Sequence, residues 1–473
     1  MATLQTLPIE LIEQIFGYLP RRDLGAVFRT CWLFHRTVTP RLFERIVIRL
    51  HDSSTLEQLR AFLDPEYFAR ALRYTKELHI VAEEFPLWER SQAAYGKLLI
   101  PVILAMQQCE TVRITIGDGY EITREPSLFE NSIRDAILAL PVVKNMEYHC
   151  KACMWPPAII KNTVTGLKSY TVRLEPGPRG FHPDYFLGPR PAVRLMLGMR
   201  DLIDAAIGGR PDLEYLEIHT GETIFFPSLG DAFRGEQVRA GPPLNLVSLI
   251  VTGVRIDQLA ITWALPHLRN LQVFDFKPTV FSFTLNSGST DILWRAFSAA
   301  SIKLRVLCTP RSVTRTLLSY VRSYTGLEEF CTSRGPATPR DLGLTEVLTV
   351  VSLHSDTLRS LDLAYKGWRL DCDGVRQLRQ CSQLVRLKLA SSIQGLLDIL
   401  GKVSTLPMLR TLDIKPFGST SNGGRTDQIG VQFARNATMQ KMIEEFELDP
   451  NSALKVIKFC GVVCRGEQEE DED

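Results

Sequence analysis

The sequence lacks the features that mark membrane-spanning, secreted and strongly charged proteins. Its longest apolar stretch, Leu98 to Met106, contains Pro101 and is too short to span a bilayer. The first five residues hold no basic group of the kind that begins a signal peptide. Lys and Arg total 55 against 53 Asp and Glu, a net charge of +2, so no overall field favours nucleic acid or an anionic membrane. We therefore expect a cytoplasmic or nuclear protein whose partners include neither nucleic acid nor membrane.

Motifs for catalysis and metal binding are also missing. The sequence contains no G-x-S-x-G turn, no H-E-x-x-H helix and no protein-kinase signature. His149-Cys150 and Cys153 form the densest group of metal-binding residue types, but a structural zinc site needs four ligands, and the nearest later cysteines are Cys308 and Cys331. The ten cysteines are expected to be reduced core thiols. We expect no metal, no cofactor and no catalytic residue, although distant residues can still assemble a site in the fold.

Apolar residues, in contrast, are plentiful. Hydrophobic residues make up 45% of the 473 residues and charged residues 23%, and the mean hydropathy is −0.01. This composition is typical of a globular chain with a large core. The length allows two or three average domains or one extended array of repeats.

The first fifty residues predict three short helices. Pro8 suits the first position of a helix, where its missing N–H has no intrahelical partner. Apolar residues then recur with helical spacing on one face: Leu11, Ile12, Ile15, Phe16 and Leu19. Pro20 is expected to end this helix, Asp23 to cap a second, and a third to run from Leu33 to Pro40. A unit of this size buries too little surface to be stable alone, so we expect it to pack on the following domain or on a partner.

This region resembles an F-box. The residues that carry the resemblance are Leu7-Pro8-Ile9-Glu10-Leu11-Ile12-Glu13-Gln14-Ile15-Phe16-Gly17-Tyr18-Leu19, then Arg21-Arg22-Asp23-Leu24, then Val27, Cys31 and Phe34, and finally Thr39-Pro40-Arg41-Leu42-Phe43. The match covers residues 5–46 in order and spacing. It departs from the family at Trp32-Leu33, where a polar residue is more usual. An ordinary helical hairpin packed on its own core is the alternative.

The resemblance implies that this module docks on a Skp-type adaptor and, through it, on a cullin–RING ubiquitin ligase. Carried over by position, the residues that would make or support this contact are Leu7, Pro8, Ile12, Ile15, Phe16, Leu19, Leu24 and Val27. The ligase chemistry would be done by partner proteins, so no residue of this chain need be catalytic.

Behind this region one sequence phrase recurs. It has the form L-x-x-L-x-L with swaps among apolar residues, and its copies begin at residues 43, 75, 109, 143, 167, 213, 246, 268, 304, 327, 358, 384, 409 and 454. Alternate apolar residues lie on one face of a strand. The intervals of 22 to 46 residues leave room for a turn and a helix before the next strand. Stacked units of this kind form a parallel sheet with helices on one side.

The array resembles irregular leucine-rich repeats. The expected fold class is α/β, with an F-box-like helical domain at residues 1–46, a solenoid with a curved parallel sheet and helices on its convex side at residues 47–465, and a disordered acidic tail at residues 466–473. The Asn that the family places beyond each phrase is absent, because Lys366, Ser392 and Phe417 stand near that position. Two Gly- and Pro-rich stretches, residues 175–191 and 415–424, are expected to be exposed loops.

If the repeats stack as predicted, the residues between the apolar strand positions point to the inner, concave face. By register these candidate target-binding residues are Glu217, His219, Gln272, Phe274, Glu329, Cys331, Asp362, Arg386, Lys388, Asp413, Lys415 and Lys458. The face mixes both signs, with a modest basic patch at Arg386, Lys388, Lys415 and Lys458, and this suits a protein or peptide target better than a polyanion. A small molecule bound there, as in some plant hormone receptors of similar architecture, has no support in the sequence.

The resulting hypothesis is a substrate-recognition subunit of an SCF-type ubiquitin ligase. The F-box-like region would dock on the adaptor, and the repeats would hold a target near a ubiquitin-loaded enzyme, so that catalysis is by proximity. One alternative is a repeat scaffold unconnected to ubiquitin, whose N-terminal helices cap the array. The other is a hydrolase built on distant residues.

Overall fold

The computed structural model of this chain describes residues 7–50, 53–64, 71–82, 88–116, 136–137, 139–150, 166–174, 212–220, 229–233, 238–239, 241–254, 256, 258–277, 289–309, 313–332, 342–363, 370, 372–391, 393–416, 437–444, 452–459 and 462–465. The chain divides into two compact units, Met1–Leu246 and Val247–Asp473. Among the described residues we find no helix with the length and apolar character that a membrane crossing requires.

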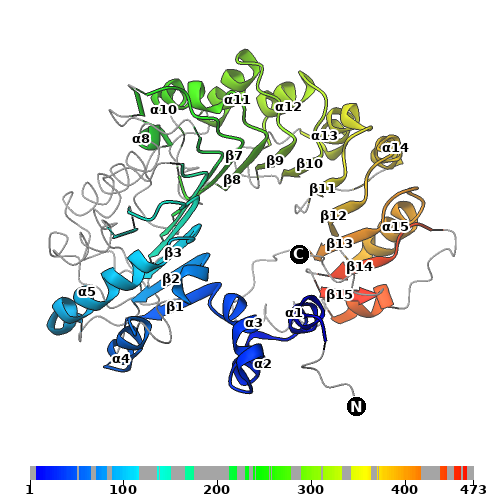
Figure 1. Cartoon of the computed structure of the whole chain (residues 1–473). Helices are drawn as coiled ribbons and strands as arrows, with labels where there is room; N and C mark the ends of the chain where they lie inside the picture. The colour runs from blue at the N-terminus through cyan, green and yellow to red at the C-terminus, as the bar shows by residue number, and fades with distance from the viewer. Residues whose placement is uncertain are drawn as a thin grey trace, which may run out of the picture. The chain divides into compact units, whose positions relative to one another are not determined.

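The first unit begins with three helices and continues as parallel strands with helices between them (Figure 1). Its described helices are α1 (Ile9–Gly17), α2 (Arg21–Phe28), α3 (Trp32–Leu42), α4 (Ser53–Phe62), the 3-10 helix η2 (Leu72–Tyr74), α5 (Trp88–Ala105) and α8 (Leu229–Phe233). Its described strands are β1 (Arg45–Arg49), β2 (Glu77–Ala82), β3 (Thr111–Ile116), β4 (Asn145–Cys150), β5 (Ser169–Leu174) and β6 (Tyr215–Thr220). Neighbours in chain order pair in parallel from β1 to β6.

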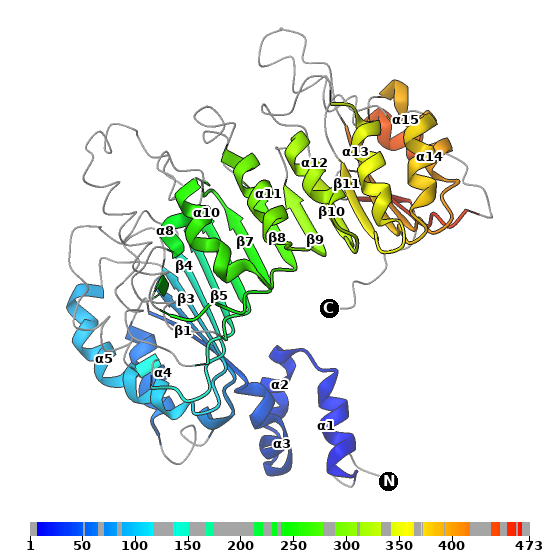
Figure 2. The same ribbon diagram turned by 90° about the horizontal axis from the view of Figure 1, so that it is seen from above.

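The second unit repeats the strand–helix alternation (Figure 2). Its described strands are β7 (Ser248–Thr252), β8 (Val273–Lys277), β9 (Val306–Thr309), β10 (Glu329–Thr332), β11 (Ser360–Leu363), β12 (Arg386–Ser391), β13 (Thr411–Pro416), β14 (Val456–Phe459) and β15 (Val462–Arg465). Pairing is parallel from β7 to β14, and β15 closes the edge antiparallel to β14. The described helices are α10 (Gln258–Ala264), η5 (Leu265–Leu268), α11 (Ser289–Ala299), α12 (Arg315–Arg322), α13 (Leu344–Val351), η7 (Ser352–His354), α14 (Cys372–Gln380) and α15 (Ile393–Val403).

We call the strands β1–β6 of the first unit the first sheet and the strands β7–β15 of the second unit the second sheet. Each has one covered face and one open face. Buried and less buried residues alternate along the strands, as in β1, β7 and β11, because successive side chains point to opposite faces. The helices lie over the face that carries the buried residues (Figure 2). In the second unit this core includes Phe274 of β8 packed at 6.0 Å on Trp294 of α11, which stacks at 5.8 Å on Tyr320 of α12. The predicted α/β fold, with N-terminal helices and one parallel strand for each phrase, is therefore confirmed.

The strand register follows the phrases with one exception. In the phrase at 358, for example, Leu358, Leu361 and Leu363 are all at most 1% exposed, as predicted. The phrase read at Leu268 is placed three residues too early, because Phe274 pairs with Leu249 of β7 in the register that buries both. The strand therefore follows Leu271-Gln-Val-Phe274-Asp-Phe276, a second match to the same apolar pattern.

Two local predictions in the helical region were wrong. Asp23 does not cap α2, because Pro20, in an extended conformation, directly precedes the helix and places Asp23 in its first turn. The acidic side chain still lies near the positive end of the helix dipole. Pro40 does not end α3, which continues to Leu42. The predicted loop at 415–424 begins too early, because Lys415 and Pro416 belong to β13. Residues 417–424, the stretch at 175–191 and the acidic tail lie outside the described residues.

Candidate docking surfaces

The helix α1 separates its apolar residues into two stripes. Ile12 and Phe16, four residues apart, are at most 4% exposed and face the other two helices. Leu11, Ile15 and Tyr18, with the spacing i, i+4 and i+7, are 45%, 40% and 82% exposed. We call these three residues the α1 stripe. Large apolar side chains that share an open helix face are typical of a protein contact.

The buried stripe is the core of the helical domain. Ile12, Phe16, Leu24 and Val38 are buried together, and the rings of Phe16 and Phe34 meet edge to face at 5.1 Å. The residues that pack around this core while staying partly exposed are Leu7, Leu19, Val27, Phe28, Leu33, Phe34 and Leu42. This core is small and is completed only by half-buried side chains.

The eight residues carried over from the F-box resemblance therefore divide by burial. Ile12, Phe16 and Leu24 are at most 4% exposed and can only support a contact, because their side chains are enclosed by the domain itself. Leu7, Leu19 and Val27 are half-buried, and Pro8 and Ile15 are exposed. Sequence reasoning missed Leu11 and Tyr18 as surface residues. Their i, i+7 spacing was visible, but the sequence does not say which of two adjacent apolar stripes faces inward.

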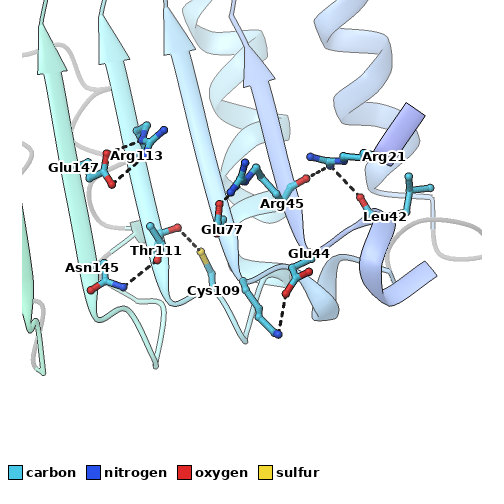
Figure 3. Close-up of polar contacts among 11 residues, drawn as sticks. Arg21, Leu42, Glu44, Arg45, Glu77, Cys109, Thr111, Arg113, Asn145 and Glu147 are labelled. Atoms are coloured by element: carbon cyan, nitrogen blue, oxygen red, sulfur yellow. Dashed lines mark hydrogen bonds and ion pairs between the residues drawn. The ribbon is translucent and has the colours of Figure 1, made fainter. Parts of the chain in front are cut away.

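Arginine side chains fix this helical domain on the first sheet (Figure 3). Arg21 of α2 donates to the carbonyl of Leu42 at 3.0 Å and to the carbonyl of Arg45 at the start of β1. Arg41 of α3 donates to the carbonyls of Phe16 and Gly17 at the end of α1, where the last turn leaves carbonyls without helical partners. Arg21 thus connects α2 to the start of β1, and Arg41 connects α3 to the end of α1 within the helical domain.

The same junction holds an open pocket of about 200 Å³. Its lining includes Arg21, Arg41, Arg45, Glu44 and Glu77. Arg45 pairs with Glu77 of β2, and Lys76 pairs with Glu44 at 2.9 Å. The hydrogen bond and the charge of Glu77 raise the pKa of Arg45. Because these charged groups already have partners, the junction is a structural connection.

The open face of the first sheet carries ion pairs between neighbouring strands. Arg113 of β3 holds Glu147 of β4 through two hydrogen bonds of 2.7 and 3.0 Å (Figure 3). Partial burial works to raise the pKa of Glu147, but the hydrogen bonds and charge of Arg113 outweigh it and lower the pKa. One step along the sheet, Arg173 of β5 pairs with Glu217 of β6 at 2.9 Å, and Tyr215 donates to the same carboxylate at 2.8 Å.

The open face of the second sheet is less evenly paired. Lys388 of β12 lies between Asp362 of β11 at 3.5 Å and Asp413 of β13 at 3.4 Å. Burial works to lower the pKa of Lys388, but the two carboxylates raise it. Lys277 and Asp275 pair within β8 at 2.6 Å.

The predicted target-binding residues are brought to these open faces with two corrections. The residues that lie on the open face of their strands, half-buried or exposed, are Glu217, His219, Glu329, Cys331, Asp362, Arg386, Lys388, Asp413, Lys415 and Lys458. Phe274 is 0% exposed and belongs to the core, and Gln272 lies before β8. Both errors come from the three-residue shift of that phrase. Target binding by the remaining residues stays a prediction.

The cysteines are only partly the core thiols that the sequence predicts. Burial raises the pKa of Cys109 to about 12 and that of Cys381 to about 11, as expected for protonated core thiols. Cys308 and Cys331 are half-buried, and Cys372, at the start of α14, is exposed. Within the described part of the chain, no three His, Cys, Asp or Glu residues gather as metal ligands would. Cys153 lies outside the described residues.

Comparison with known proteins supports the identity of the helical domain. The model of the F-box-like family matches residues 4–49, which contain α1, α2, α3 and β1. The chain therefore carries an F-box-like domain. No curated protein matches the sequence. The family match covers the helical domain and the first strand alone, so the role of the sheets must be argued from their geometry.

Proposed function

We propose that this protein is the substrate-recognition subunit of an SCF-type cullin–RING ubiquitin ligase. The α1 stripe docks on a Skp-type adaptor, and the open face of the sheets binds the target protein. The chain has no catalytic part in this reaction, because it brings the target close to an enzyme that another subunit supplies. We also propose that residues 47–465 form a solenoid of irregular leucine-rich repeats.

One observation carries the proposal. Leu11, Ile15 and Tyr18 are exposed on a helix of the domain that matches the F-box-like family, although each is large and apolar. Exposing such side chains in water is unfavourable, and fully burying a fully exposed one yields about 1.5–3 kcal/mol. Leu11 and Ile15 are already more than half covered, so a partner would gain roughly half of that value from each. A partner protein that covers the stripe would gain this free energy.

The experiment is a binding measurement between the full chain and a Skp-type adaptor. A triple variant, Leu11→Ala, Ile15→Ala and Tyr18→Ala, should bind the adaptor at least about tenfold more weakly, because truncating central apolar contacts costs more than 1 kcal/mol each. The variants remove exposed side chains, so the domain core of Ile12 and Phe16 should stay folded, which circular dichroism would verify.

A matched control removes three exposed leucines from the second unit. Leu259, Leu353 and Leu397 are 70%, 50% and 48% exposed, comparable with the α1 stripe. Their replacement by Ala should leave adaptor binding unchanged. Equal loss in both triple variants, or no binding by the unaltered chain, would favour the repeat scaffold unconnected to ubiquitin.

A further inference from the structure

The last strands of the second sheet carry positive charges that no acidic side chain pairs with among the residues that the structure describes. Arg386 of β12 and Lys415 of β13 are exposed, and Lys458 of β14 is half-buried. Lys388 pairs with Asp362 and Asp413, the only acidic residues that point to the open face of β11–β14 among the described positions. Within the described part of the chain, Arg386, Lys415 and Lys458 form no ion pair. We call these three residues the basic triad.

The register places the basic triad on one face at defined spacings. Arg386 is level with Thr411, and Lys458 is level with Asp413, so the three cations lie on three successive parallel strands. With strands about 4.8 Å apart and about 3.3 Å per residue, their Cα atoms are about 8, 12 and 14 Å from one another. Asp413 lies inside this triangle, level with Lys458, whereas Lys388 on β12 and Asp362 on β11 lie outside it.

Two further cations extend the positive surface at the start of the strands. Arg410 precedes β13, Lys455 precedes β14, and both side chains are exposed. The backbone holds them next to each other, because the N–H of Lys455 donates to the carbonyl of Arg410 at 3.0 Å. The corresponding position before β10, three strands before β13, differs, because Glu328 there receives two hydrogen bonds of 2.9 Å from Arg305.

We propose that the open face of β12–β14 binds an acidic segment of the target protein, a stretch of Asp and Glu in extended conformation. This inference rests on the proposed function only in calling the ligand a target. Carboxylates two residues apart on an extended chain are about 6.6 Å apart and match the shorter spacing of the basic triad. Asp413 inside the triangle and Asp362 on the neighbouring strand β11 would repel the continuous phosphate chain of a nucleic acid, whereas discrete carboxylates can avoid them.

The test is fluorescence anisotropy with the full chain and a labelled eight-residue peptide that alternates Asp or Glu with Ser. The triple variant Arg386→Gln, Lys415→Gln and Lys458→Gln should bind it roughly tenfold or more weakly, because each cation lost removes an attractive pair. Binding by the unaltered chain should weaken as salt is added. A peptide with Asn and Gln in place of the acids should not bind.

The control variant removes the same charge elsewhere in the second unit. Arg269, Lys303 and Arg322 are all exposed and none lies in a strand: Arg269 follows η5, Lys303 follows α11, and Arg322 is the last residue of α12. Changing all three to Gln should leave peptide binding unchanged. An equal loss in both variants would assign the effect to net charge and overturn the proposal, as would no binding by either the full chain or a chain without residues 466–473.

The acidic end of this chain provides a further outcome. Six of the seven residues 467–473 are acidic, and they follow β15 closely in the sequence. If only the chain without residues 466–473 binds the peptide, the face belongs to the chain's own acidic segment, and the partner assignment is overturned. Adaptor binding is measured separately through the α1 stripe, so failure of one proposal does not imply failure of the other.

Discussion

The open faces of the two sheets differ in whether their charged side chains have ionic partners. In the first unit, arginines on β1, β3 and β5 each pair with a glutamate on the next strand: Arg45 with Glu77, Arg113 with Glu147 and Arg173 with Glu217. In the second unit, Lys388 has two carboxylates, whereas Arg386, Lys415 and Lys458 have none among the described residues. Paired charges hold adjacent strands in register. Unpaired charges leave the surface open to a ligand of opposite sign.

The largest expected effect is in β8, and it tests which residues of this strand face the core and which lie on the open face. Phe274→Ala should lower the free energy of unfolding by about 3–5 kcal/mol, because the ring is fully buried against Trp294 and Phe297. Val273→Ala, one residue earlier on the open face, should cost about 1 kcal/mol or less. Urea unfolding followed by circular dichroism measures both. Equal effects would mean that β8 does not have the register described above.

A buried histidine makes the second unit sensitive to acid. His354 accepts from the N–H of Leu327 at 3.2 Å and lies 3.1 Å from the carbonyl of Val321, which is the geometry of a neutral ring. Burial lowers the pKa of His354 below its usual 6.5. The unfolded chain then binds the proton more readily, so the unfolding free energy should fall as pH drops below 6.5.

Substitution isolates this effect. His354→Gln should cost about 1–3 kcal/mol at neutral pH, because buried backbone groups lose partners, and it should flatten the dependence on pH between 7 and 5. Unfolding curves at several pH values would show this. An unchanged slope in the variant would assign the acid sensitivity to other groups, such as His267, whose pKa is also lowered by burial.

The paired face of the first unit should respond to loss of one partner. Glu217→Gln should lower the unfolding free energy by about 1–2 kcal/mol, because the carboxylate is 12% exposed and accepts from both Arg173 and Tyr215. Thermal unfolding at neutral pH is the measurement. If Glu217→Gln is as stable as the unaltered chain, the cross-strand pair contributes nothing to the sheet.

The smallest effect on stability is expected on the unpaired face. Lys458→Gln should change the unfolding free energy by no more than about 0.5 kcal/mol, because the side chain has no ionic partner among the described residues to lose. The same thermal unfolding experiment measures it beside Glu217→Gln. A cost as large as that of Glu217→Gln would show that Lys458 has a structural role, and the contrast between the two faces would disappear.

Much of the architecture was predictable because it is local in the sequence. Alternation within six residues predicts a strand and its buried face, and it does so even at Thr75, a polar residue in an apolar position that is 0% exposed. It fails at Phe274, because Leu268 and Leu271 both offer a start for the same phrase. Local patterns therefore predict that a strand exists more securely than they predict its register.

The contacts that distinguish the two faces were not predictable. Arg173 and Glu217 are 44 residues apart, and Arg41 reaches a carbonyl 25 residues earlier in the chain. The number of residues between strands determines such pairs, and no spacing rule in a single sequence supplies it. For the same reason, the modest basic patch predicted from sequence included Lys388, whose charge is already compensated by Asp362 and Asp413.

The arginine junction has a consequence for direction. Because Arg41 of α3 holds the end of α1 and Arg21 of α2 holds the start of β1, the helix α1 cannot rotate against that strand without breaking one of these sets of hydrogen bonds. A protein seated on α1 would then project from the first sheet at one angle. Arg41 does not belong to the α1 stripe. We therefore expect its loss to change the orientation of such a protein and to leave the affinity of its binding unchanged.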